Sequence, residues 1–216
     1  MKFKSSKFII LLLFLSPLII NSQTFKSYGL NFGTTFHEEG WEKPDTFSYY
    51  YHDKVYISTY TIGLYGEFLA KKYVSTIVNA SFRARQYFFE YDLVDISEAM
   101  EVKNTLYFAT LSVTEKLKFD FDRWSIYTFG GFKADYQISK SIDKDFQNVF
   151  DGSKQFLLGT TAGIGFAKRI AKFWRVSFDL YYDYDITKMY ESSNGYVRNQ
   201  GFGFKIGFGP YNPANK

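Results

Sequence analysis

Apolar and polar side chains alternate at almost every position of residues 173–186, FWRVSFDLYYDYDI. The side chains of a β-strand point to its two faces in turn, so an alternation with period two indicates a strand with one apolar and one polar face. The stretch is also long: a tilted strand needs roughly 9–11 residues to cross a bilayer, whereas strands of soluble proteins average about 5–6. This pattern therefore predicts a membrane-spanning β-strand.

Seven other segments repeat the pattern, namely residues 27–36, 57–69, 73–89, 104–119, 124–138, 156–167 and 200–208. The connections between the eight segments alternate strictly in length. Those at 37–56, 90–103, 139–155 and 187–199 are long, and those at 70–72, 120–123 and 168–172 are short. Outer-membrane barrels have long extracellular loops and short periplasmic turns. The sequence therefore predicts an all-β fold: an eight-stranded antiparallel transmembrane up-and-down β-barrel with periplasmic termini.

The first 22 residues differ from the rest of the chain. Lys2, Lys4 and Lys7 precede an apolar run at 8–20, and small and polar residues follow at Asn21 and Ser22. This order of basic, apolar and small residues is typical of a secretory signal peptide, and the run is too short for a spanning helix. We therefore expect residues 1–22 to be a cleaved signal peptide and 23–216 to be one barrel domain in the outer membrane of a Gram-negative cell.

Composition narrows the possible functions. Aromatic residues make up 22% of the chain, which suits a barrel whose outer wall meets lipid and two membrane interfaces. Cysteine is absent, which excludes a disulfide framework, a cysteine metal site and a cysteine nucleophile. A formal charge of +4 provides no basic patch for nucleic acid.

Aromatic and charged residues distinguish the two ends of the predicted barrel. Aromatic residues near the short turns are Phe68, Tyr73, Phe119, Trp124, Phe173 and Trp174, and those toward the long loops include Tyr60, Tyr87, Tyr136 and Tyr184. Two aromatic girdles are expected of a spanning barrel. The turn end carries the basic residues Lys71, Lys72, Arg123, Lys168, Arg169 and Lys172, whereas the first two long loops are acidic.

Charged residues also occur on the strand faces opposite the apolar rows. The alternation directs nine of them into the lumen: Glu67, Arg83, Arg85, Lys133, Asp135, Arg175, Asp179, Asp183 and Lys205. They could form an ion path, or a paired polar network that fills a narrow barrel, because buried charges persist when they are partnered. An eight-stranded barrel has an interior just wide enough for side chains, so we favour the filled lumen.

The long loops carry a second set of candidates. Their aromatic residues, a possible protein-contact surface, are Trp41, Tyr49, Tyr50, Tyr51, Phe146, Phe150, Tyr190 and Tyr196. Exposed aromatic clusters are typical of contact sites, although anchoring at the membrane interface would use the same residues. The only histidines, His37 and His52, both fall in the first long loop, and their spacing follows no metal-binding motif. We therefore expect no cofactor, no metal site and no enzymatic activity.

Two neighbouring stretches resemble a known family. LSVTEKLKF at 111–119 and IYTFGGF at 126–132 resemble the small outer-membrane β-barrel proteins of Bacteroidota, the PorT-like group. That group often has a proline where Thr114 stands and apolar residues where Glu115 and Lys116 stand. The resemblance implies an eight-stranded, non-enzymatic barrel, and some relatives serve protein secretion.

These observations together indicate a structural or accessory role. We expect an interaction module of an envelope complex, possibly in protein secretion or outer-membrane assembly. Its partners would be outer-membrane lipid, lipopolysaccharide and at least one protein, and not nucleic acid. The alternatives are a small outer-membrane enzyme and a soluble ligand-binding β-barrel, whose apolar row would face inward.

Overall fold

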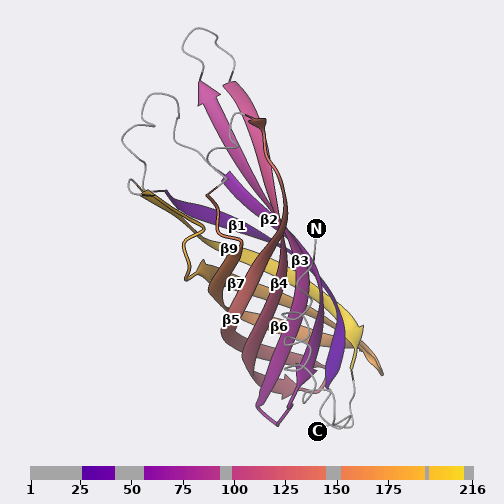
Figure 1. Ribbon diagram of the computed structural model, residues 1–216. Coiled ribbons are helices and arrows are strands. Elements are labelled where there is room, and N and C mark those ends of the chain that lie inside the picture. Colours follow the sequence, from indigo (N-terminus) through magenta and orange to yellow (C-terminus); the bar gives the residue numbers. More distant parts are fainter. Residues whose placement is uncertain (1–25, 42–55, 93–98, 145–151, 193–194, 212–216) are drawn as a thin grey trace, which may run out of the picture.

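The computed structural model describes residues 26–41, 56–92, 99–144, 152–192 and 195–211. The strands in these ranges form a single antiparallel sheet that closes on itself through pairing of its first and last long strands (Figure 1). Within the same ranges no helix is long and apolar enough to cross a membrane. The fold is thus a closed eight-stranded antiparallel barrel, as the alternating pattern predicts.

The strands are longer than most of the segments predicted from the sequence. Their bounds are β1 (Ser27–Trp41), β2 (Tyr56–Phe68), β3 (Val74–Asp92), β4 (Ala99–Phe121), β5 (Trp124–Ser141), β6 (Phe156–Ala171), β7 (Trp174–Asp185), β8 (Tyr190–Ser192) and β9 (Gly195–Pro210). Strand β8 was not predicted. It has three residues and pairs with the first part of β9, in a region expected to be loop.

The register of the pairing fixes the shape of the barrel. Starting at Tyr28 and stepping from partner to partner, the path runs through Gly66, Val78, Val113, Phe132, Thr160, Tyr184 and Gln200 and returns to β1 at Glu38. The path therefore returns ten residues along β1 (38 − 28 = 10). With eight strands and ordinary strand spacings, this shear gives a tilt of about 40° and a backbone radius of about 8 Å. Such a barrel is filled by its own side chains.

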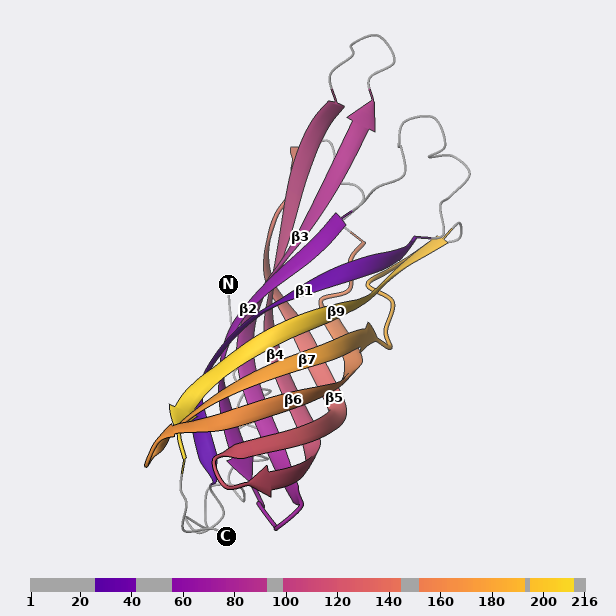
Figure 2. The ribbon, with the colours of Figure 1, turned by 180° about the vertical axis from the view of Figure 1, so that it is seen from behind.

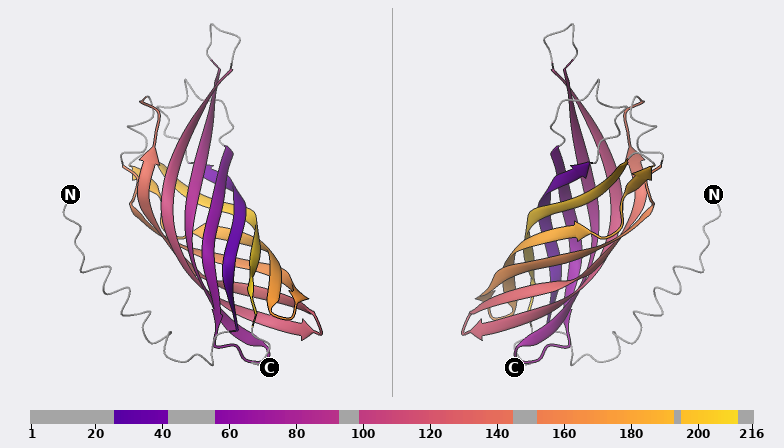
Figure 3. Two further views of the ribbon diagram at one scale, coloured as in Figure 1. Left: turned by 90° about the vertical axis from the view of Figure 1, so that its right-hand side faces the viewer. Right: turned by 90° about the vertical axis from the view of Figure 1, so that its left-hand side faces the viewer.

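The two ends of the barrel differ in the connections between their strands and in how far the strands project. At one end β2 and β3 are joined by residues 69–73, β4 and β5 by Asp122 and Arg123, and β6 and β7 by Lys172 and Phe173. Ser27 and Tyr211 form a bridge, so the described chain also begins and ends there. At the other end the β3–β4 hairpin stands above the remaining strands (Figures 1 and 3).

The predicted turns were too wide in two places. Asp120 belongs to β4, and Lys168 and Arg169 belong to β6, so these residues lie within strands and not in turns. The turns themselves are tight. Leu69 and Asp122 adopt positive φ angles of 47° and 26°, which non-glycine residues seldom do outside such turns. The turn end of the barrel is still basic, as predicted from the sequence, because Lys168 and Arg169 lie close to the turn between β6 and β7.

The outer wall of the barrel is apolar all the way round. In the described part of the chain 33 large hydrophobic side chains are exposed and only nine hydrophobic residues are buried, the reverse of a soluble core. Aromatic rings meet across neighbouring strands of this wall. Trp174 stacks on Phe208 with ring centroids 4.7 Å apart, and Phe178 lies between Phe166 and Phe204. Figure 2 shows β6, β7 and β9, the strands that carry these residues, side by side. The apolar row of each strand therefore faces outward, as predicted.

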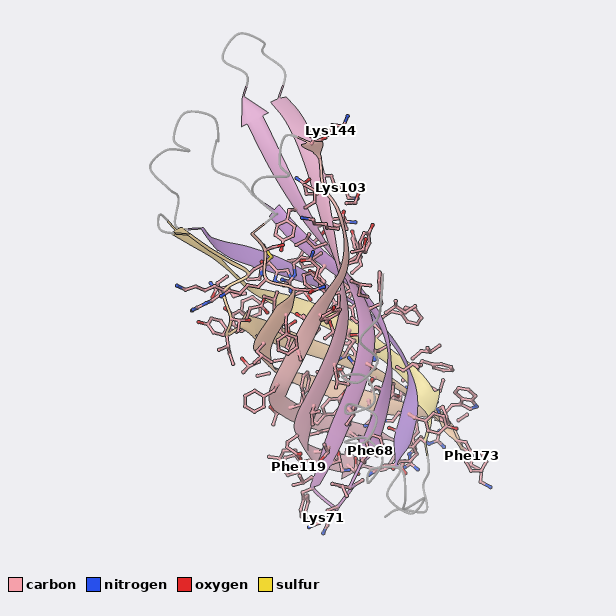
Figure 4. The ribbon with its side chains drawn as sticks, in the orientation of Figure 1. Phe68, Lys71, Lys103, Phe119, Lys144 and Phe173 are labelled. Carbon is pink, nitrogen blue, oxygen red and sulfur yellow. The ribbon has the colours of Figure 1, made fainter. Side chains whose placement is uncertain are left out.

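Rings and lysines are also combined near the turns. Phe68, Phe119, Phe173 and Lys71 lie at the turn end of the barrel (Figure 4). The ammonium group of Lys168 lies 4.4 Å from the centre of the Trp124 ring, and that of Lys72 lies 4.9 Å from the Tyr73 ring. Aromatic rings next to basic groups are typical of a membrane interface.

Candidate functional site

All nine charged residues predicted to face the lumen do so. Eight are buried, and Lys205, whose side chain is 24% exposed, points inward from β9 toward Asp179. They come from five strands, and the shear of the barrel brings seven of them together in two clusters, while Asp179 and Lys205 pair with each other. We call the one toward the long connections the aspartate cluster and the one toward the short turns the Glu67 cluster.

The aspartate cluster contains three cations and three carboxylates: Arg83, Arg85, Lys133, Asp135, Asp183 and Asp185. Arg83 donates to Asp183 over 2.6 Å, and Lys133 lies 2.8 Å from Asp185. Asp135 lies 3.5 Å from Arg85 and also accepts from Thr110. Formal charges balance within the cluster, so each buried ion has a partner of opposite sign.

The Glu67 cluster is different because it contains a single carboxylate, which three cations share. Glu67 is 1% exposed and lies 3.3 Å from Lys116, 3.3 Å from Lys118 and 3.1 Å from Arg175. It also accepts hydrogen bonds from Ser27 and Ser75. Four formal charges here sum to +2.

A further ion pair, outside the two clusters, lies at the turn end of the lumen. Lys26, which precedes β1, lies 3.2 Å from Asp120. Burial lowers the pKa of the Lys26 ammonium group, but the nearby Tyr211, Asp120 and Glu67 outweigh this effect and the net pKa is raised. Lys26 and Asp120 therefore form an ion pair with no excess charge.

Between the two clusters part of the lumen is occupied by aromatic rings that lie over glycines. Tyr127, Phe129 and Tyr181 are buried in the interior and face Gly165, Gly163 and Gly203. A Cβ atom on Gly165 would lie 2.5 Å from Tyr127, and one on Gly203 would lie 2.6 Å from Tyr181. These glycines therefore provide the space into which the rings pack, and the hydroxyl of Tyr127 donates to Asp179.

Buried apolar side chains form a cap at the end of the lumen toward the long connections. Met189, from the segment between β7 and β8, is buried, and its sulfur accepts a hydrogen bond of 3.0 Å from the hydroxyl of Tyr87. Leu106, Phe108 and Leu157 are buried as well. Tyr87 was expected in the outer aromatic girdle, but its position in β3 directs it inward, in phase with Arg83 and Arg85.

The space left inside is small. A cavity of about 70 Å³ lies between the clusters and is lined by side chains of both, among them Glu67, Arg83 and Arg175. Pockets for organic ligands have volumes of roughly 300–1,000 Å³ and are mostly apolar. A cavity of this size accommodates water or a small ion. This cavity, which the described residues line, is thus too small to be the ligand pocket of a soluble barrel.

The sequence pattern placed His37 in the first long loop, and this was wrong: His37 lies in β1. Its ring is buried in the lumen, and Nε2 lies 2.8 Å from the Thr59 hydroxyl. His52, the other histidine, lies outside the described residues. Among the residues that are described, no three His, Cys, Asp or Glu side chains are placed to hold a metal ion.

Several predictions concern parts of the chain outside the described residues. The signal peptide at 1–22 is one, and the loop aromatic residues Tyr49, Tyr50, Tyr51, Phe146 and Phe150 are another. Trp41, Tyr190 and Tyr196 lie in β1, β8 and β9, but the positions of their side chains are not described. The loop contact surface therefore stays a prediction.

Three members of the clusters were not among the predicted site residues. Lys116 and Lys118 of β4, and Asp185 of β7, face the lumen and complete the ion pairs. Lys118 follows Lys116 by two residues, and Asp185 follows Asp183 by two. The same alternation that identified Asp183 could therefore have identified them.

Comparison with known proteins supports the fold. No protein-family model matches the chain, and no curated protein sequence matches it. Among solved structures it is similar to the outer membrane protein OprG from Pseudomonas aeruginosa, with 12% identity, a TM-score of 0.54 and coverage of 88% of this chain and 98% of that one. The Escherichia coli outer membrane protein W has 12% identity, a TM-score of 0.46 and coverage of 87% and 98%. The chain thus has the fold of an outer-membrane β-barrel protein.

Proposed function

We propose that this protein is an integral outer-membrane barrel that serves as a structural or accessory subunit of an envelope complex. The observation that supports membrane residence most directly is the distribution of polarity. Charged side chains are buried and paired inside, while large apolar side chains cover the outside. Only a lipid environment stabilises such a wall, because exposed apolar surface of this extent is not tolerated in water.

The proposed orientation places the short turns and both termini in the periplasm. Two features of the structure support it. The short connections and the described chain ends share one end of the barrel, and the extended β3–β4 hairpin lies at the other. Outer-membrane barrels have this polarity, with their longer connections outside the cell.

A structural role is favoured over transport or catalysis by the state of the lumen. The aspartate cluster, the packed rings and the cap around Met189 follow one another along its length. The described charged groups of the lumen contact one another, and none of them is arranged as a nucleophile beside a base. The proposed protein is therefore a filled, non-enzymatic barrel.

Membership of the PorT-like group of Bacteroidota is a finer part of the proposal. The two stretches that resemble the group, 111–119 and 126–132, form adjacent strands of one hairpin, with Val113 paired to Phe132 and Glu115 to Gly130. Since some relatives serve protein secretion, secretion or outer-membrane assembly is the envelope process that we favour for this chain.

Membrane fractionation tests the location. Membranes from cells that produce the chain are washed with alkaline carbonate and then extracted with detergent. The protein should stay with the membrane through the wash and dissolve only in detergent. Its recovery in the soluble periplasmic fraction would contradict the proposal.

A hairpin deletion tests the accessory role. In the matched variant residues 89–102 are replaced by a two-residue turn, which shortens the β3–β4 projection and leaves the pairing below Phe88 and Lys103 intact. We expect crosslinked envelope proteins to co-purify with the full chain and to be lost from the variant. Recovery of the full chain only as a monomer, after crosslinking in cells, would contradict the accessory role and leave the membrane location standing.

A further inference from the structure

The excess of positive charge around Glu67 requires an explanation. Lys116, Lys118 and Arg175 are each at most 4% exposed, and Glu67 is the only carboxylate within ion-pair distance of any of them among the described residues. Nearby carboxylates are already engaged: Asp179 lies 3.6 Å from Lys205, and Asp120 lies 3.2 Å from Lys26. Buried ions without a counter-charge are strongly destabilising.

One hydrogen-bond donor of the cluster is also unused. Arg175 binds Glu67 through Nη1, whereas its Nη2 is buried and no acceptor of the described residues reaches it. The Tyr211 ring lies 5.6 Å from the guanidinium carbon. Buried guanidinium groups ordinarily have their donors satisfied, so a free Nη2 in a region of excess positive charge points to a missing acceptor.

Space for such an acceptor lies beside Arg175. Arg175, Lys116 and Glu67 all line the cavity of about 70 Å³. This volume exceeds that of a water-sized occupant and is far below that of an organic ligand. An occupant that is small and negatively charged would supply the missing acceptor and reduce the excess charge.

We infer that the cavity binds a halide ion, in practice chloride, between Arg175 and Lys116. A spherical monovalent anion suits the site better than an oxyanion. Phosphate or sulfate would require several unpartnered nitrogens around its oxygens, and among the described residues Arg175 Nη2 is the one buried cationic nitrogen of this cluster that makes no hydrogen bond. The inference does not depend on the proposed role in an envelope complex.

Crystals grown with bromide in place of chloride test the inference directly. Bromide has a strong anomalous signal, so an anomalous difference peak should appear in the cavity next to Arg175. A complete data set with peaks at surface lysines and none in the cavity would overturn the inference. The positive charge would then be absent because a lysine in the cluster is neutral.

Thermal unfolding provides a second measurement. Purified protein in detergent is compared in sodium chloride and sodium gluconate at equal ionic strength. Chloride at about a hundred times its dissociation constant should raise the unfolding temperature by roughly 5–10 °C, in a saturable manner. The variant Arg175→Gln should lose this dependence on chloride, whereas Lys72→Gln, at an exposed turn lysine, should keep it.

Each outcome of this comparison decides the matter. Equal chloride effects in the wild type and in Arg175→Gln would show a non-specific salt effect and overturn the inference. Should Arg175→Gln fail to fold, the same comparison is made with Lys116→Met, which removes the other cation that lines the cavity, and the bromide crystals use the unaltered chain.

Discussion

Glu67 is the single carboxylate within ion-pair distance of three buried cations, Lys116, Lys118 and Arg175, among the described residues. Replacing it by glutamine keeps the shape and removes the charge. Glu67→Gln should lower the free energy of unfolding by about 3–5 kcal/mol, because it leaves buried cations without a counter-charge. Urea titration of the protein in detergent, followed by tryptophan fluorescence, measures the change.

Glu115 offers a matched control for this substitution. It lies in β4, next to Lys116 in the chain, its side chain faces outward, and it accepts one hydrogen bond from Thr76. Glu115→Gln should change the unfolding free energy by less than about 1 kcal/mol, as expected for exposed polar groups. Equal effects of the two substitutions would show that the three cations do not rely on Glu67.

At the scale of single residues, the alternation predicted which side chains face the lumen but not which of them pair. Strand period two determines the face of every residue in a strand, so Glu67 and Arg175 were both identified. Their contact joins residues 108 positions apart, from β2 and β7. It depends on the shear of the closed barrel, which cannot be deduced from the alternation of side chains within any single strand. The same shear brings Lys133 to Asp185.

Among the elements, β6 shows most clearly how glycines shape the barrel. It contributes Gly159, Gly163 and Gly165 to the inner face, and Tyr127 of β5 fills the space beside Gly165. In Gly165→Ala the new methyl group would lie within 2.6 Å of the Tyr127 ring and of Asp179. We expect a loss of about 1–3 kcal/mol in unfolding free energy, the usual range for overpacking.

Gly130 in β5 is the control for this substitution. A Cβ atom there would have its nearest neighbours at 3.9 Å, so the methyl group fits without displacement. Gly130→Ala should therefore leave the unfolding free energy within about 0.5 kcal/mol of the wild type. A loss as large as that of Gly165→Ala would mean that intrinsic strand preference, and not the ring above Gly165, causes the effect. Both variants are measured by the same urea titration.

The elements also show where a sequence pattern stops being informative. Each long strand was predicted, because an alternation over nine or more residues is unambiguous. The ends were less accurate: β3 and β4 extend to Asp92 and Ala99, beyond the predicted limits, because pairing within a hairpin does not require an apolar face. Strand β8, with three residues, is too short to show any period.

For the whole molecule, a filled lumen predicts an absence of ion flow. Reconstituted into a planar bilayer, the protein should show no stable open conductance, because the two clusters, the packed rings and the cap around Met189 block the interior. A porin incorporated in the same way serves as the positive control. A steady and reproducible pore would contradict the filled-lumen interpretation.

The environment of the outer wall is testable by one charged substitution at mid-height. Phe132 is 70% exposed and lies near the middle of β5, eight residues after Trp124 and nine before Ser141. In a lipid-facing position Phe132→Arg should cost about 2–4 kcal/mol, whereas the cost falls to about 0–1 kcal/mol near an interface. Phe173→Arg, in the turn between β6 and β7, provides that interfacial comparison. Refolding titrations into lipid vesicles measure both.

In a barrel that folds in water, exposed arginines at the two positions would be equally harmless. A large difference between two exposed phenylalanines is therefore expected only if the apolar wall lies in a bilayer, with Phe132 near its centre and Phe173 at its edge.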